Sequence, residues 1–169
     1  MDLLDSLRMM AGYNHWMNER LYVICAGLSD EERKRDRRAF FRSIHGTLNH
    51  LLLTDRGWLA RFNRKPWPFP ALDQELYADF DELRRERGRT DREIEEFLAG
   101  IAPERLDAPL GYENYAEEKF THPLGPAIVH LFNHQTNHRG QLTTLLTQLG
   151  IDPGVTNAIV FYREQQTGR

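Results

Sequence analysis

Three histidines stand at intervals of four residues in the C-terminal half of the chain: His130, His134 and His138. On an α-helix this spacing places them in one slowly drifting column. The outer two lie about 12 Å apart along the axis, whereas each ligand nitrogen must come within about 2.1 Å of a bound metal ion. All three therefore cannot bind one ion, but an adjacent pair can present two imidazoles to a divalent metal.

The apolar pattern of the same segment indicates which pair faces inward. With about 100° per residue, the apolar stripe is centred near Leu142 and Leu149. His138 lies about 20° from the middle of this stripe, His134 about 60° and His130 about 100°. His134 and His138 are thus the inner pair. The alternative is that ordinary hydrogen bonds satisfy these histidines without a metal.

A third ligand must come from another helix, and an earlier segment offers His45 and His50. His45 lies on the flank of the apolar stripe of that segment, whereas His50 lies on the opposite side. The neighbours of His50 on that side are small or polar: Ser43, Gly46, Thr47, Thr54 and Gly57. Such a face is expected to line a groove, to let a neighbouring helix approach closely, or to be exposed to solvent. The helical pattern alone does not decide between His45 and His50.

The helices that would position these histidines are predicted from apolar residues that recur every three or four positions. Four such runs are long enough to be helices, and they cover residues 3–28, 41–62, 76–101 and 124–149. The Pro-rich stretch 63–70 ends the second run, because proline lacks an amide donor and restrains the residue before it. Pro126 and Gly150 mark the start and the stop of the fourth run. Residues 102–123 are expected to form an irregular loop or a short hairpin, and residues 157–166 a short helix.

Four long helices with one apolar stripe each bury those stripes most simply in a four-helix bundle. The chain of 169 residues has the size of one domain. We therefore expect an all-α fold, a four-helix bundle with a short C-terminal helix, as a single domain over residues 1–169.

Composition and missing motifs exclude several functional classes. The net charge of −3 is spread along the chain, which argues against a nucleic-acid partner. No apolar stretch approaches the roughly 20 residues that span a bilayer, and the start of the chain lacks a cationic signal-peptide region, so a cytoplasmic protein without a membrane partner is expected. The single cysteine, Cys25, lies among apolar neighbours, which is typical of a buried thiol and not of a nucleophile. Neither the HExxH motif of zinc proteases nor the Glu-x-x-His pair of di-iron bundles is present.

Three segments resemble signatures of the DinB family of bacterial helical proteins, the DinB/YfiT-like group of proposed metalloenzymes. The first is residues 13–21, YNHWMNERL, and the second is residues 48–55, LNHLLLTD, with Trp58. The third and most specific is residues 130–141, HLFNHQTNHRGQ. The resemblance extends over nearly the whole chain.

This resemblance implies an up-down-down-up topology whose long crossover includes the Pro-rich stretch. It also implies a metal triad of His50, His134 and His138, and so it selects His50 over His45. Zinc or nickel is the expected ion, and iron, copper or manganese are the alternatives. Relatives often dimerise, so a homodimer is expected.

Three neutral imidazoles leave a bound ion its full charge and an open position, which is typical of catalytic sites. Such an ion lowers the pKa of bound water or thiol. The resemblance favours metal-dependent transfer of a low-molecular-weight thiol, such as bacillithiol, mycothiol or glutathione, to a small-molecule substrate, with hydrolysis as the second route. The alternative function is a non-catalytic metal-binding or stress-response helical protein.

Three further residues are candidates for a role beside the metal ligands. His130 is expected either to be buried for a purely structural reason or to lie beside the ligands or at the edge of the pocket, and not on the ion. Asp55 is expected to orient a histidine, to act as a base, or to pair with an arginine such as Arg56 or Arg139. Arg139 is a candidate contact for an anionic substrate or a partner of an aspartate.

Overall fold

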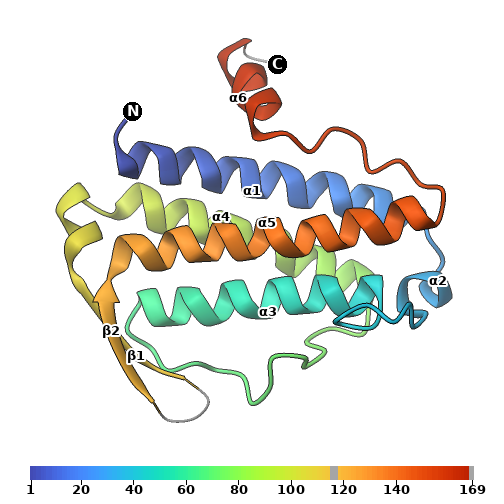
Figure 1. The fold of residues 1–169 in the computed structure, drawn as a ribbon, viewed down its shortest axis with the longest axis horizontal. Coiled ribbons are helices and arrows are strands. Elements are labelled where there is room, and N and C mark those ends of the chain that lie inside the picture. Colours follow the sequence, from blue (N-terminus) through green and yellow to red (C-terminus); the bar gives the residue numbers. More distant parts are fainter. Residues whose placement is uncertain (115–117, 168–169) are drawn as a thin grey trace.

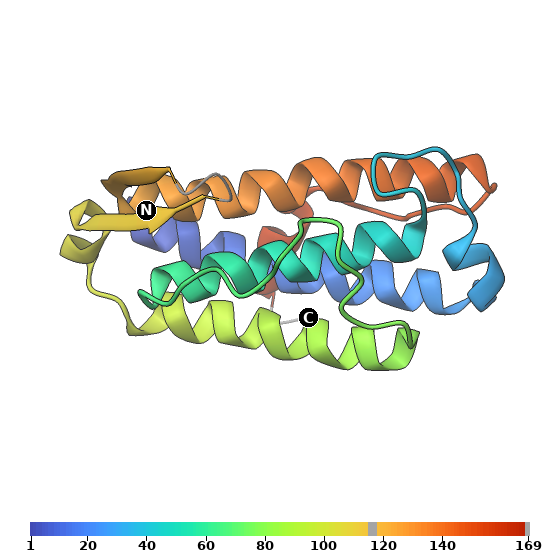
Figure 2. The ribbon, with the colours of Figure 1, turned by 90° about the horizontal axis from the view of Figure 1, so that it is seen from below.

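The computed structural model describes residues 1–114 and 118–167. Its four long helices lie side by side (Figures 1 and 2): α1 (Leu3–Ala26), α3 (Ile44–Phe62), α4 (Phe80–Gly100) and α5 (Leu124–Gln148). The shorter helical segments are α2 (Asp30–Lys34), the 3-10 helix η1 (Pro103–Asp107) and α6 (Ala158–Thr167). The helical class expected from the apolar spacing is confirmed, and so is the short C-terminal helix.

The connections between the long helices explain their directions. Residues 63–79 return along α3, so that α4 begins near the same end of the molecule as α3 and runs in the same direction (Figure 2). Helix α1 packs against α4 and α5, and α3 packs against the same two helices. No helix in the described part of the chain is long and apolar enough to cross a membrane.

Side-chain caps set where three of these helices begin. The side chains of Asp2, Ser43 and Asp79 accept hydrogen bonds from the first-turn amides of α1, α3 and α4. Such caps satisfy amides that lack a partner within the helix. Helix α5 ends at Gln148, and Gly150 follows two residues later with a φ of 74°, in the left-handed region that favours glycine just beyond a helix.

Two helix boundaries differ from the apolar runs. Phe41 and Leu76 continue the periodic spacing of the second and third runs, but both lie outside the helices that follow them. Phe41 stacks on His50, and the amide of Leu76 donates to Asn49 Oδ1 at 2.8 Å. Leu76 packs against the core from a loop, and Phe41 packs on the rings of His50 and His138, so their helical spacing is a coincidence.

The segment between α4 and α5 combines η1 with a hairpin, one of the two possibilities left open. Strand β1 (Pro109–Glu113) pairs antiparallel with β2 (Lys119–Pro123), and Tyr112 faces Phe120 across the pair. The two rings stack with their centroids 5.8 Å apart. The hairpin packs against the helices through the buried Leu110.

The core contains a layer of buried polar side chains between two apolar clusters. In this layer Arg87 of α4 forms ion pairs with Asp91 and with Asp55 of α3, each at 2.8 Å. Asn18 of α1 donates to Asp91 at 2.9 Å, and Arg139 of α5 donates to Asn14 of α1. All four long helices therefore meet through polar contacts at mid-height.

Candidate metal centre

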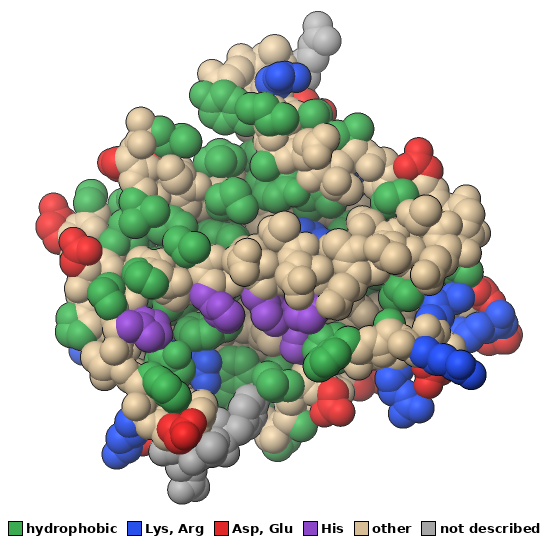
Figure 3. Space-filling view, in the orientation of Figure 1, with side chains coloured by type: hydrophobic (Ala, Val, Ile, Leu, Met, Phe, Trp, Pro, Cys, Tyr) green, Lys and Arg blue, Asp and Glu red, His purple; other side chains and the backbone are tan. Residues whose placement is uncertain are grey.

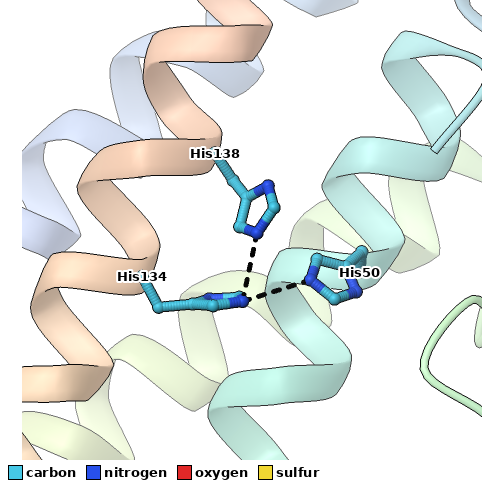
Figure 4. Close-up of side chains that lie close together, drawn as sticks. All are labelled: His50, His134 and His138. Atoms are coloured by element: carbon cyan, nitrogen blue, oxygen red, sulfur yellow. Dashed lines mark hydrogen bonds between the residues drawn. The ribbon is translucent and has the colours of Figure 1, made fainter. Parts of the chain in front are cut away.

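The structure brings His50, His134 and His138 together between α3 and α5. Figure 4 shows the ring of His50 turned from α3 toward the two rings that α5 presents. His134 Nε2 lies 3.3 Å from His50 Nε2 and 3.1 Å from His138 Nε2. The ligand nitrogens of all three lie within 4.8 Å of one another.

These separations fit three nitrogen ligands of one ion. Two nitrogens about 2.1 Å from a tetrahedral zinc ion lie about 3.4 Å from each other. Two neutral imidazole nitrogens that both lack a proton do not attract each other, so the approach of these Nε2 atoms needs a proton or a cation between them. The cluster is therefore suited to a divalent metal by donor type and by spacing.

Hydrogen bonds at the far side of two rings fix their tautomers. His50 Nδ1 donates to the carbonyl oxygen of Leu72 at 2.8 Å, and His138 Nδ1 donates to Gln141 Oε1 at 2.8 Å. A proton on Nδ1 leaves the Nε2 lone pair free to bind a metal. Bonds of this kind orient metal-binding histidines and raise their basicity.

Burial keeps two of the rings uncharged. It lowers the pKa of His50 to about 4, although the bond to Leu72 acts in the opposite direction. It lowers the pKa of His134 to about 3, and the neighbouring histidines lower it further. Both imidazoles are thus neutral at pH 7, which is the form that binds metals.

The segment between α2 and α3 covers the site on one side. The ring of Phe41 stacks on His50 with centroids 3.6 Å apart and planes at 17°, and it meets the His138 ring edge-on at 5.3 Å. The segment turns tightly, because Arg38 and Arg42 adopt φ values of 58° and 65°. The periodicity gave no sign of this cover, because it placed Phe41 inside a helix.

His45 is buried beside this site but does not join it. Its Nε2 donates to the carbonyl oxygen of Tyr77 at 2.9 Å, in the connector that leads to α4. Burial lowers the pKa of His45 as well. The structure therefore places His50, and not His45, beside His134 and His138.

The three accessory candidates have other partners. His130 is exposed on α5, so the expectation of structural burial was wrong. Its ring lies 5.2 Å from that of Trp58 and 6.0 Å from that of His134. Asp55 pairs with Arg87, and not with either arginine named from the sequence. Burial raises the pKa of Asp55 to about 6, against the opposite influence of Arg87.

Arg139 is enclosed in the polar layer. It is 3% exposed and donates to Asn14, so the core holds its guanidinium away from any small-molecule ligand. In the part of the chain that the structure describes, no hydrogen bond joins Arg139 or Asp55 to the three histidines. The hydrogen bonds that orient the histidines come from Leu72 and Gln141. Of these two residues, only Gln141 could be found from the sequence, by its helical spacing from His138.

Cys25 is buried, as expected from its neighbours. Burial raises the pKa of its thiol to about 12. At neutral pH the thiol is protonated and enclosed, so it does not act as a nucleophile.

Comparison with known proteins relates both fold and sequence to one family. The model of the DinB family matches residues 3–169. Protein DinB of Bacillus subtilis (strain 168) is 27% identical over 142 residues, which are 82% of this chain and 83% of that protein. A crystal structure of a DinB-like protein from Bacillus cereus ATCC 10987 aligns with a TM-score of 0.61 at 20% identity, over 82% of this chain and 90% of that one. At that identity the structural match concerns the fold.

Proposed function

Since this chain belongs to the DinB family, we propose that it is a divalent-metal-binding protein whose ligands are His50, His134 and His138. In this proposal it is a metal-dependent enzyme that activates a low-molecular-weight thiol or water for transfer or hydrolysis. Zinc and nickel are the preferred ions, because both accept imidazole nitrogen in sites with open positions.

One observation carries the proposal. The Nε2 atoms of the three rings face a common point, while the Nδ1 atoms of His50 and His138 are occupied by carbonyl acceptors. A set of histidines that served the core alone would direct its nitrogens toward separate hydrogen-bond partners. The arrangement supports metal binding over ordinary burial.

A divalent ion supplies positive charge that lowers the pKa of a bound water or thiol to near neutrality. The chain's own residues prepare the place for this chemistry. Leu72 and Gln141 orient the rings of His50 and His138, and Phe41 excludes water from one side of the His50 ring. The nucleophile then comes from the thiol or water, because Cys25 is buried and protonated.

A second candidate is a metal-binding protein without turnover. It is favoured by the pairing of Asp55 with Arg87, which leaves no carboxylate in hydrogen-bond contact with the three histidines among the described residues. Turnover of an electrophile that depends on both the ion and a thiol supports the enzyme. Metal-dependent stabilisation with no turnover supports the second candidate.

The test is metal content measured by elemental mass spectrometry on untagged protein. We expect about one ion per chain in the parent and nearly none in a folded His134→Ala/His138→Ala variant. The matched control is His130→Ala, on the same helix but outside the cluster, which is expected to retain the metal. A parent that takes up no metal after reconstitution, or a double variant that binds like the parent, contradicts the proposal.

Family membership also supports three broader parts of the proposal. The chain is a single domain over residues 1–169 with the up-down-down-up four-helix topology. It acts on a small-molecule substrate, with no nucleic-acid or membrane partner. It is a cytoplasmic homodimer, which light scattering coupled to size exclusion tests directly.

A further inference from the structure

A second concave site lies apart from the three histidines, between the β1–β2 hairpin and the segment that follows α3. Its volume is about 860 Å³, which is within the range of pockets that enclose small organic molecules. Both strands contribute to its wall, as does the Pro-rich stretch through Pro66, Trp67 and Phe69.

The charged side chains along this pocket are mostly cationic. Arg61, Arg64, Lys65 and Lys119 line it, and Glu113 is the one acidic residue in its described lining. Lys119 Nζ lies 3.6 Å from the Glu113 carboxylate, so that acid is balanced within the pocket. In a chain with a net charge of −3, the exposed Arg64 and Lys65 thus leave a local excess of positive charge in the described lining, and this excess attracts anions.

Aromatic rings form the rest of the wall. Trp67, Phe69, Tyr112 and Phe120 line the pocket, and the stacked pair Tyr112 and Phe120 closes its strand side. The guanidinium carbon of Arg61 lies 4.4 Å from the ring centre of Trp67 and 4.3 Å from that of Tyr112. Arg61 therefore stacks on both rings and is itself only 8% exposed, whereas Phe120 is 42% exposed and leaves aromatic surface open to a flat ligand.

We propose that this pocket binds a small organic anion that carries a flat ring, such as an aromatic carboxylate. The rings take the planar body by stacking, and the exposed cations Arg64 and Lys65 take the negative group. This inference does not depend on metal binding, because none of the three clustered histidines lines the pocket.

A row of rings joins the pocket to the candidate metal centre. Tyr112 lies 5.4 Å from Trp58, Trp58 lies 5.2 Å from His130, and His130 lies 6.0 Å from His134, measured between ring centroids. Figure 3 shows histidine side chains in a line along this face of the molecule. An anion in the pocket would therefore occupy the same face as the three histidines.

The experiment is a calorimetric titration of metal-free protein, in chelator, with 2-naphthoate as the probe. The uncharged 2-naphthalenemethanol, of closely similar shape, is titrated in parallel. We expect one naphthoate per chain and at least about tenfold weaker binding of the alcohol, because the alcohol lacks the charge that the cations attract. Amide shifts in the NMR spectrum are expected at Gly111, Tyr112 and Thr121.

A matched pair of charge variants tests the location. Arg64→Gln/Lys65→Gln is expected to weaken naphthoate binding at least about fivefold, whereas Arg85→Gln/Arg92→Gln, with the same charge change on α4, changes it less than about twofold. Circular dichroism checks that both variants fold. The proposal is overturned if naphthoate does not bind at millimolar concentration, or if the alcohol binds as tightly as naphthoate. It is also overturned if the two variants weaken naphthoate binding equally, or if the amide shifts are confined to the three histidines.

Discussion

The backbone carbonyl oxygen of Phe41 lies against Gly46, in the space that a Cβ atom on residue 46 would occupy. This contact holds the segment before α3 close to the first turn of the helix. The same segment stacks Phe41 on His50. A glycine, with no side chain to place in the site, thus controls the cover over the candidate ligands.

A Gly46→Ala substitution is therefore expected to displace the cover. The backbone of Phe41 must move to admit a methyl group, at a loss of about 1–3 kcal/mol in unfolding free energy. Metal affinity is expected to fall about tenfold, because His50 loses its stacking partner. Urea unfolding and competition with a chromogenic chelator measure the two effects.

The control for this substitution is Gly88→Ala in the middle of α4. A Cβ atom there meets only the flexible end of Arg92, at 3.7 Å. Alanine in a helix interior is expected to raise stability by about 0.5–1 kcal/mol. If Gly46→Ala behaves like Gly88→Ala in both measurements, the role assigned to Gly46 is wrong.

The bond from His138 to Gln141 predicts a loss of affinity without loss of fold. A Gln141→Leu variant removes the acceptor of the His138 Nδ1 proton, so the ring is free to rotate and to change tautomer. Metal affinity is expected to fall about 10–100-fold, with one ion still bound at saturation. Gln148→Leu, an exposed change on the same helix, is expected to leave affinity unchanged, and an equal loss in both variants would refute the prediction.

The buried polar layer predicts a large effect of one carboxylate. Asp91→Leu leaves the Arg87 guanidinium with only Asp55 as an ionic partner and leaves Asn14 and Asn18 without their acceptor. Unfolding free energy is expected to drop by about 3–5 kcal/mol in a denaturant titration. The comparison is Glu96→Leu, an exposed position on the same helix, where a change below about 0.5 kcal/mol is expected. Similar losses at both positions would mean that the layer does not stabilise the core.

The depressed pKa of His50 predicts how the metal-free protein responds to acid. Between its ordinary value of about 6.5 and its folded value of about 4, His50 binds a proton in the unfolded chain but not in the folded one. Stability therefore rises with pH across this window and is lost on acidification. Relative to a His50→Leu variant, the parent is expected to lose up to about 1.4 kcal/mol more per pH unit between pH 6 and 4.5. Denaturant titrations in chelator check this, and parallel pH profiles of the two proteins would contradict it.

The long helices could be predicted because each buries an apolar stripe of regular period. The run 124–149 becomes α5, Leu124–Gln148, and the run 3–28 becomes α1, Leu3–Ala26. The same argument predicted that His134 and His138 face inward, because they lie nearer than His130 to the single apolar stripe of α5. Periodicity failed where loops carry apolar residues onto the core, as with Leu76, or onto the histidine rings, as with Phe41.

The third histidine could not be chosen by helical pattern, because α3 is covered on nearly every side. Its polar face lies under the connectors, where Trp67 packs on Gly57 and Leu72 reaches His50. Along a helix, the polar residues of a face that is buried under a loop have the same spacing as those of a face that is exposed to water. The choice of His50 over His45 therefore rested on the resemblance to the DinB family. The partner of Asp55 was not predicted, because Arg87 belongs to a helix far along the chain.

The hydrogen bond from Gln135 Nε2 to the carbonyl oxygen of Leu51, 3.1 Å long, sets the axial register of two helices. Apolar surfaces tolerate sliding, whereas a shift of one helical turn, about 5.4 Å, would break this bond. Gln135 follows His134 in the chain, and Leu51 follows His50. The bond therefore keeps histidines of α3 and α5 at the same height, so that the alignment of the candidate ligands is specified by neighbours that bind no metal.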